Sequence, residues 1–298
     1  MSLLTRLFTP NFVWSFAVYA TGQPFPPDLT IEQPIKVFNS KRLRFFRRQP
    51  HTQADPFLLV DNETLFVFYE QMYPGSIGRI ACSKTVDLKS FEDCGVILSE
   101  DHHLSWPFVL RADGEIYMVP ESRQAGRVKL YRFDNLPNAI SEIRTLREGK
   151  YVDPVLLRHQ DHWYLFATSE RGLELFVSDN LLTGKFEPHP KSPITADLRF
   201  SRSGGPPIQN GDILIRVAQD CSCGYGDNIN FVEIATLTPN DYEERPFQMS
   251  YFKKQNSWNR DGAHHLSLAS FRGFSVVAVD GRQRDHWVNR LLRRPAFR

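Results

Sequence analysis

The chain repeats a short signature at intervals of about 45 to 50 residues, and this periodicity limits the possible folds more than any other feature. The first three copies read Ala54-Asp55-Pro56-Phe57, Leu104-Ser105-Trp106-Pro107-Phe108 and Val152-Asp153-Pro154-Val155. An apolar run, a turn and a second run rich in Tyr, Phe and Val follow each copy. Two further starts read Ser201-Arg202-Ser203-Gly204-Gly205 and Gly262-Ala263-His264-His265-Leu266. Strand-turn-strand units of this length are typical of propeller blades, so the sequence predicts an all-β, five-bladed β-propeller.

Length and composition fit one domain of this kind. The 298 residues include 13% aromatic residues and 20 prolines, which favours many strands and turns over long helices. No linker or break in composition is present, so we expect a single propeller over residues 1–298 with a basic tail at 282–298. The segment Phe12–Tyr19 alternates large and small residues. We expect it to pair with the blade formed by Trp258–Gly281 and to close the ring.

The apolar segment Phe12–Ala20 also resembles the core of a signal peptide. Only Arg6 supplies a positive charge before it, and Pro10-Asn11 intervenes, so a strand is the favoured interpretation. No run of about 20 apolar residues exists, which predicts that no apolar helix crosses a membrane. We therefore expect a cytoplasmic protein.

The cysteines give no sign of a metal site. Cys82 can approach Cys94 if they lie on adjacent strands, and Cys221-Ser222-Cys223 resembles half of a metal site. No second Cys or His pair stands at zinc-finger spacing. We therefore expect reduced structural thiols, no metal and no cofactor.

Positive charge is concentrated rather than abundant. The net charge is only +2, which excludes a general affinity for polyanions. Five cations nevertheless lie in the stretch Lys41–Arg48, directly before Asp55, and the tail Arg282–Arg298 carries six arginines. This placement predicts an anionic sugar or phosphosugar ligand at the mouth of the funnel. It also allows peripheral contact of the tail with an anionic membrane. No reading helix or stacking-sheet motif accompanies the charge, so no nucleic-acid partner is expected.

Acidic residues at the ends of apolar runs are the candidate catalytic groups. Asp55 precedes Pro56, which predicts an extended backbone and a side chain directed into the funnel, where it would act as general base. Asp153-Pro154 repeats the pattern two blades later, and Asp153 would orient a sugar hydroxyl or tune the pKa of another acid. Glu121 follows the apolar run Ile116–Val119 and would act as the acid, while Glu70 occupies the matching position in blade 1 and competes for that role.

Basic and aromatic residues are the candidate binding groups. Arg202 would bind a carboxylate or phosphate, or else pair with Asp55 or Asp220. Hydrogen bonding to sugar hydroxyls is the favoured role of the histidines, with metal ligation as the alternative, and flat rings would stack on sugars unless they belong to the core. The candidate substrate-binding residues are Glu70, His103, Trp106, Arg202, Arg216, Asp220, Tyr225 and His264.

Six motifs in this order resemble the N-terminal propeller of plant glucosamine inositolphosphorylceramide transferase and its stand-alone bacterial relatives. They are Ala54–Phe57, His103–Phe108, Tyr117–Ser122, Arg202–Gly205, Gln219-Asp220 with Tyr225-Gly226, and Gly262–Leu266. The layout is more remotely similar to five-bladed glycosidases that cleave arabinans, xylans and fructans. Two departures are Ser203, where the relatives usually carry Pro, and Ser267, where they often carry an acidic residue.

The resemblance implies a carbohydrate-active enzyme that transfers or hydrolyses a glycosyl unit in cell-surface glycan metabolism, with paired carboxylates at a central funnel. A phosphorylated donor is included in this expectation. In the plant proteins a separate C-terminal domain resembles the glycosyltransferase, and we expect no such domain in this chain, so the resemblance does not fix the chemistry of the propeller. A non-catalytic glycan-binding or scaffold propeller is the alternative, because fold alone does not determine function.

Overall fold

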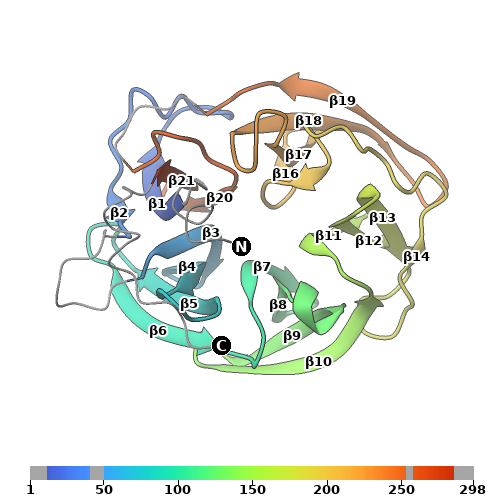
Figure 1. Ribbon diagram of the computed structural model, residues 1–298, viewed down its shortest axis with the longest axis horizontal. Coiled ribbons are helices and arrows are strands. Elements are labelled where there is room, and N and C mark those ends of the chain that lie inside the picture. Colours follow the sequence, from blue (N-terminus) through green and yellow to red (C-terminus); the bar gives the residue numbers. More distant parts are fainter. Residues whose placement is uncertain (1–11, 41–49, 253–257, 285–298) are drawn as a thin grey trace, which may run out of the picture.

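The structure is a computed structural model that describes residues 12–40, 50–252 and 258–284. Strands form almost all of its regular structure, and one 3-10 turn, η1 (Arg123–Ala125), is its single helical element within those residues. The strands stand in sets around a common centre, with the first strand of each set innermost (Figure 1). None of the described segments forms a helix long and apolar enough to cross a membrane. The predicted all-β propeller is confirmed.

Strand pairing groups the described strands into four sheets. We divide the largest sheet at its single parallel pair, between β1 and β3, and call the resulting five sets blades 1 to 5. Blade 1 contains β3 (Thr52–Asp61), β4 (Thr64–Met72), β5 (Arg79–Thr85) and β6 (Glu92–Leu98). Blade 2 contains β7 (Ser105–Ala112), β8 (Glu115–Glu121), β9 (Arg127–Asn135) and β10 (Ala139–Glu148). Blade 3 contains β11 (Val152–His159), β12 (His162–Ser169), β13 (Gly172–Ser178) and β14 (Glu187–Pro188).

In blade 4 the inner strand is split into two short pieces. These are β15 (Arg202–Ser203) and β16 (Ile208–Asn210), which both pair with β17 (Ile213–Asp220), and β18 (Asn228–Leu237) and β19 (Tyr242–Gln248) follow. Blade 5 contains β20 (Leu266–Phe271), β21 (Phe274–Arg284), β1 (Phe12–Thr21) and β2 (Lys36–Phe38).

The N-terminal strand pairs with blade 5, as predicted. β1 runs antiparallel to β21 from the pair Phe12↔Arg284 to the pair Thr21↔Ser275. One parallel pair, Trp14↔Thr52, also joins β1 to β3. Blades 5 and 1 therefore form one eight-stranded sheet, where the sequence predicted two separate blades. The expected tail at 282–298 starts within β21, and its part beyond Arg284 lies outside the described residues.

Apolar side chains pack between neighbouring blades. Phe57 of blade 1 meets Trp106 and Phe108 of blade 2 edge to face, with ring centroids 5.2 and 5.7 Å apart. Phe57 and Phe166 are at most 1% exposed, and burial of a side chain of this size stabilises the fold by about 1.5–3 kcal/mol. This packing fixes the inner strands, and with them the residues at their starts.

Blades 1, 2 and 3 share a β-bulge at the repeated signature. The pairing register slips between Ala54 and Phe57, between Ser105 and Phe108, and between Val152 and Val155. Within each bulge the residue before proline has a left-handed φ of 54° at Asp55, 50° at Trp106 and 52° at Asp153. The prediction of an extended backbone at Asp55 is therefore wrong. The extra residue of the bulge re-aims the backbone and outweighs the preference set by the following proline.

Candidate active site

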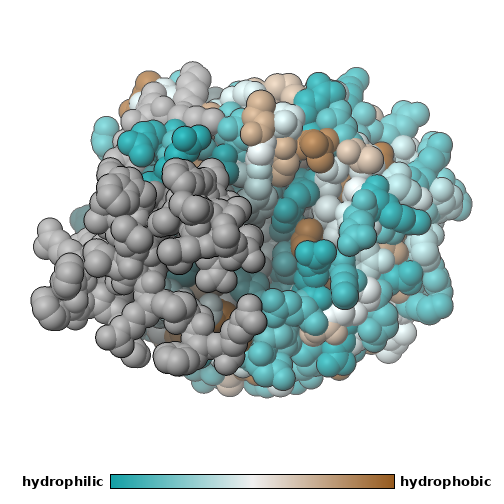
Figure 2. All heavy atoms as spheres, viewed as in Figure 1, coloured by the Kyte–Doolittle hydropathy of each residue, from teal (hydrophilic) through white to brown (hydrophobic). Residues whose placement is uncertain are grey.

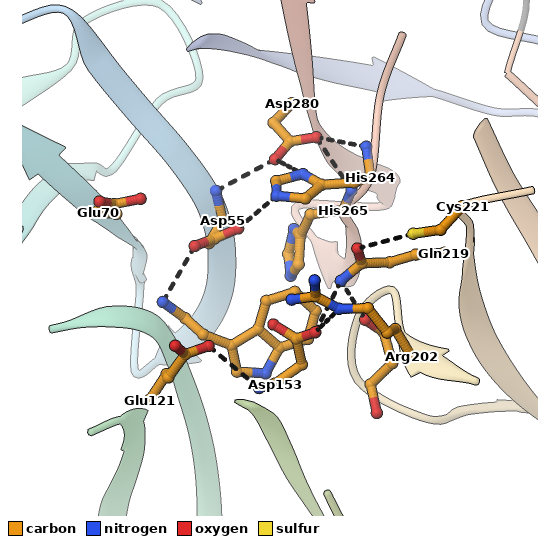
Figure 3. A network of polar contacts seen from close by, with 12 residues as sticks. Asp55, Glu70, Glu121, Asp153, Arg202, Gln219, Cys221, His264, His265 and Asp280 are labelled. Atoms are coloured by element: carbon orange, nitrogen blue, oxygen red, sulfur yellow. Dashed lines mark hydrogen bonds and ion pairs between the residues drawn. The ribbon is translucent and has the colours of Figure 1, made fainter. Parts of the chain in front are cut away.

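The bulges and the ends of the second strands bring polar side chains together at the centre of the ring (Figure 3). Glu70 lies opposite Ala54 in blade 1, and Glu121 lies opposite Ser105 in blade 2. Gln219 takes the matching place opposite Arg202 in blade 4. The end of each of these second strands therefore presents a polar residue beside the start of the inner strand.

Asp55 is buried and contacts groups from two other blades. One carboxylate oxygen, Oδ2, accepts the backbone N–H of Trp106 at 3.1 Å. The other, Oδ1, lies 3.4 Å from Nε2 of His264, and the Asp55 N–H donates to Oδ2 of Asp280 at 3.4 Å. Asp55 is only 4% exposed. Burial raises its pKa to about 7, although the charge of His264 acts in the opposite direction.

His264 and Asp280 form a buried pair beside Asp55. Nδ1 of His264 lies 2.5 Å from Oδ2 of Asp280, whose Oδ1 accepts the backbone N–H groups of His264 and His265 at 2.9 and 3.0 Å. Burial alone would lower the pKa of His264, but Asp280 and then Asp55 outweigh it, and the pKa is raised. Burial likewise favours the neutral form of Asp280, but the charge of His264 holds the pKa of Asp280 below its usual value. Both shifts favour an ion pair.

Asp280 was missed by the sequence analysis, although the same signal marks it. It ends the apolar run Val276–Val279 in the way that Glu121 ends Ile116–Val119. His265, the neighbour of His264, is fully buried between the rings of Phe57 and Trp106. Burial lowers the pKa of His265 to about 3, so this imidazole is neutral. The pKa values of the two adjacent histidines are thus shifted in opposite directions.

Glu121, Asp153, Arg202 and Gln219 form the second half of the cluster. Oδ2 of Asp153 accepts Nε of Arg202 at 2.6 Å and Nε2 of Gln219 at 3.0 Å. The Asp153 N–H donates to Oε2 of Glu121 at 3.3 Å. Burial and then the charge of Asp153 raise the pKa of Glu121 to about 8, while Arg202 opposes the shift. Arg202 thus pairs with Asp153, and with neither Asp55 nor Asp220.

Trp106 links the two halves. Its backbone N–H reaches Asp55, and its indole Nε1 donates to the carbonyl of Pro154 at 3.1 Å, one residue beyond Asp153. The side chain is 1% exposed and packs on Phe57. Trp106 therefore belongs to the core, and its predicted role as a stacking platform for sugars is wrong.

Glu70 and His103 form a neighbouring contact. Nδ1 of His103 accepts the N–H of Gly78 at 3.0 Å, so the neutral ring carries its proton on Nε2, which lies 3.5 Å from Oε1 of Glu70. A Cβ at Gly78 would stand 2.8 Å from that oxygen and 2.6 Å from the imidazole, which explains the glycine. Burial first, and then the charge of Asp55, raise the pKa of Glu70 well above its usual range.

Two predicted binding residues are occupied elsewhere. Arg216 is 1% exposed and makes a bidentate ion pair with Glu244 of β19, at 3.0 and 2.8 Å. The Asp220 carboxylate accepts hydrogen bonds from the Ser222 N–H and the Asn230 side chain, and it stabilises the turn after β17. Neither is available to a ligand, so both predictions are wrong. The alternation of β17 explains the result, because Arg216 lies an odd number of residues from Gln219 and faces the opposite side of the sheet.

Tyr225 lies at the rim of the cluster and is 45% exposed. Its ring meets Trp14 and His264 edge to face, at centroid distances of 5.8 and 5.1 Å, and the Arg202 guanidinium lies 4.8 Å from it. Nearly half of Tyr225 is exposed, and its stacking role stays a prediction.

Asp55, His264 and Asp280 are also the best candidate metal ligands at the centre, since one ligand atom from each lies within 4.8 Å of the others. Both imidazole nitrogens of His264, however, already face a carboxylate oxygen. A doubly protonated imidazole places positive charge between both carboxylates without an ion, so the donor set fits an ion-paired triad better than a metal centre.

The fold is shared with known glycoside hydrolases. A β-xylosidase/α-arabinofuranosidase from a compost microbial metagenome, solved with xylotriose in a calcium-free form, matches with a TM-score of 0.57 and 11% identity, over 81% of this chain and 94% of that chain. An α-L-arabinofuranosidase from Clostridium thermocellum matches with a TM-score of 0.55 and 13% identity, over 75% and 80% of the two chains. The chain is thus a β-propeller of the fold found in family-43 glycoside hydrolases.

The sequence comparisons identify the family. Residues 46–282 match the family model described as "Glucosamine inositolphosphorylceramide transferase 1, N-terminal", and the chain belongs to this family. The Glucosamine inositolphosphorylceramide transferase 1 of Arabidopsis thaliana is 34% identical over 244 residues, and that of Oryza sativa subsp. indica is 31% identical over 240 residues. Each alignment covers 76% of this chain but only 32% of the relative. The chain thus spans about a third of the length of these relatives.

Proposed function

We propose that this propeller is a carbohydrate-active enzyme that transfers or hydrolyses a glycosyl unit, with Asp55 as general base and Glu121 as general acid. One observation carries the proposal: Asp55 and Glu121 are two carboxyl groups of a single cluster with different partners, and burial raises their pKa values to about 7 and about 8. Near neutral pH, the first can accept a proton while the second can donate one. A pair divided in this way is what glycosyl transfer requires.

The contacts assign a task to each group. Glu121, the more exposed of the two, would protonate the oxygen of the leaving group. Asp55 would take the proton of the attacking water or acceptor hydroxyl, and the Trp106 N–H and the His264 imidazole hold its two oxygens in place. Asp153 is fixed by Arg202 and Gln219 and donates its N–H to Glu121. It would position the acid rather than exchange protons. Tyr225 offers the sugar an aromatic face.

The names of the relatives suggest the substrate class. They are described as transferases for glucosamine on inositolphosphorylceramide. We propose that this chain acts on a glycan of related chemistry, with a sugar joined to a phosphorylated unit, in cell-surface glycan metabolism.

A non-catalytic glycan-binding module is the second candidate. The low exposure of Asp55 and Asp153, 4% and 3%, favours it, because these groups are largely satisfied by protein partners. In this case Glu121, Arg202 and Tyr225 would bind a sugar without chemistry.

Incubation with sugar nucleotides, phosphoribosyl diphosphate and aryl glycosides, with product detection by mass spectrometry, separates the two candidates. The enzyme proposal expects turnover that both Asp55→Asn and Glu121→Gln abolish. Glu115→Gln, an exposed position at the other end of β8, is the matched control and should keep full activity. Binding without turnover of any donor or glycoside would favour the module.

A further inference from the structure

A cavity of about 320 Å³ lies beside the carboxylate cluster, between blades 2, 3 and 4. Arg202 belongs to both, because it lines the cavity and also donates to Asp153. Val152, which precedes Asp153, lines the cavity as well. A ligand in the cavity would therefore be continuous with a sugar at the cluster. Blades 2, 3 and 4 present a mostly hydrophilic surface in the view of Figure 2.

The lining of the cavity is rich in positive charge. Glu170 is the one acidic residue in the lining of the cavity. Four lining residues are cations, namely Arg123, Lys150, Arg171 and Arg202. Hydroxyl groups complete the polar lining, from Thr168, Ser169 and Ser201. Cations and hydroxyls together are the groups that bind phosphate oxygens.

Two of the four cations are neutralised by the protein and two are not. Arg171 pairs with Glu174 at 2.7 Å, and Arg202 pairs with Asp153. Arg123 reaches only Glu170, at 4.0 Å, and the Glu170 side chain is 95% exposed, so this contact is weak. Lys150 is exposed and forms no ion pair with any residue that the structure describes. Arg123 and Lys150, from the connections after β8 and β10, are thus left to attract an anion.

We propose that this cavity binds the phosphate ester of a sugar or cyclitol, held by Arg123 and Lys150, while the glycosyl unit lies at Asp55 and Glu121. The volume is at the lower end of the range for ligand pockets, roughly 300–1,000 Å³, and suits one phosphorylated ring better than a complete sugar nucleotide. The inference rests on the proposed function for the position of the reacting sugar, but not for the binding of phosphate. The sequence had predicted the anion site at Arg202, Arg216 or Lys41–Arg48. Arg216 is paired with Glu244, and Lys41–Arg48 lies outside the described residues.

The test is a binding measurement with the whole chain. myo-Inositol 1-phosphate and myo-inositol are titrated by calorimetry into the wild type and into Arg123→Gln/Lys150→Gln. The phosphorylated probe should bind more tightly than the neutral one, and the double variant should lose roughly tenfold in affinity for the phosphorylated probe alone. Added salt should weaken the wild type more than the variant.

The chain offers a closely matched control, Arg272→Gln/Lys89→Gln. The Arg272 side chain is 49% exposed and 3.9 Å from Glu63, as Arg123 is 49% exposed and 4.0 Å from Glu170. Lys89, like Lys150, is an exposed lysine, and it lies in the turn before β6. Equal losses in the control and the cavity variant, or no loss in the cavity variant, would overturn the proposal.

The source of the phosphate is resolved by a second arm with vesicles of phosphatidylcholine, with and without phosphatidylinositol. Binding to the soluble probe indicates a free phosphate ester. Binding only to the phosphatidylinositol vesicles, lost in the double variant, indicates a lipid headgroup. Binding to neither overturns the inference. If Glu121→Gln loses turnover but still binds the phosphate, both proposals are supported. If the wild type binds the phosphate but turns over no substrate, the phosphate site is supported and the proposed enzyme function is not.

Discussion

Blades 1 to 3 supply four of the five carboxyl groups of the central cluster, whereas blades 4 and 5 supply the cations Arg202 and His264. The first three blades supply the carboxyl groups of Asp55, Glu70, Glu121 and Asp153. Two of these residues, Asp55 and Asp153, lie in β-bulges directly before a proline. The last two supply the cations Arg202 and His264, and the Asp280 carboxylate of blade 5 is held by His264. The bulge signature is replaced there by glycine-rich starts. The comparison teaches that the cations which lower the pKa values of Asp55 and Glu121 come from a different part of the chain than these two acids.

The largest expected effect follows from removing a carboxyl group of the first region. Asp55→Asn and Glu121→Gln should each lower kcat/KM about 100- to 10,000-fold, the range usual for general acid–base catalysis. Steady-state kinetics on the substrate found in the screen would measure this. If Glu70→Gln lowers kcat/KM over this range and Glu121→Gln does not, the acid is Glu70.

The pH dependence of the wild type tests the division of labour within the carboxylates. Asp55 must be ionised to act as base, so kcat/KM should rise with pH up to its pKa of about 7. Glu121 must be protonated to act as acid, so the rate should fall above its pKa of about 8. The result is a narrow bell whose limbs belong to the coupled pair, with about tenfold lost per pH unit on either side. A rate that stays flat from pH 5 to 10 would contradict the assignment.

Removing a cation of the second region should shift one limb of this bell. His264 lowers the pKa of Asp55, so His264→Gln should move the acid limb to higher pH. Arg202 lowers the pKa of Glu121, so Arg202→Gln should move the alkaline limb to higher pH instead. A uniform loss of rate without movement of either limb would show that these residues only support the structure.

The smallest effect is expected at the link between the two halves of the cluster. Trp106→Phe removes the indole N–H bond to Pro154 but keeps the backbone bond to Asp55. The free energy of unfolding should fall by about 1–3 kcal/mol, because the Pro154 carbonyl loses its donor and the smaller ring leaves space in the core. Denaturant unfolding would measure it. An undiminished stability would place the link between blades 1 and 3 elsewhere.

The repeat was readable from the sequence because apolar runs and prolines are local signals. The fold, the closing strand and the grouping of Asp55, Glu121 and Asp153 followed from it, and their assembly in one cluster needed only the symmetry of the ring. The positive φ at Asp55 was not readable, because a bulge depends on pairing with β4. The ion pair of Arg216 was missed because Glu244, its partner, comes from the weakly patterned outer strand β19.

The pairing of β1 with β21 affects the order in which the site can form during synthesis. The ring of Trp14, on β1, packs on the imidazole of His264 at a centroid distance of 4.2 Å, and β1 itself pairs with β21. A ribosome makes β1 early, yet its partner emerges more than 250 residues later, as the numbering of the pair Phe12↔Arg284 shows. Contacts between such distant segments form slowly. We therefore expect His264 to acquire its final surroundings late in folding, and the nascent chain carries Asp55, Glu121 and Asp153 before this imidazole is made.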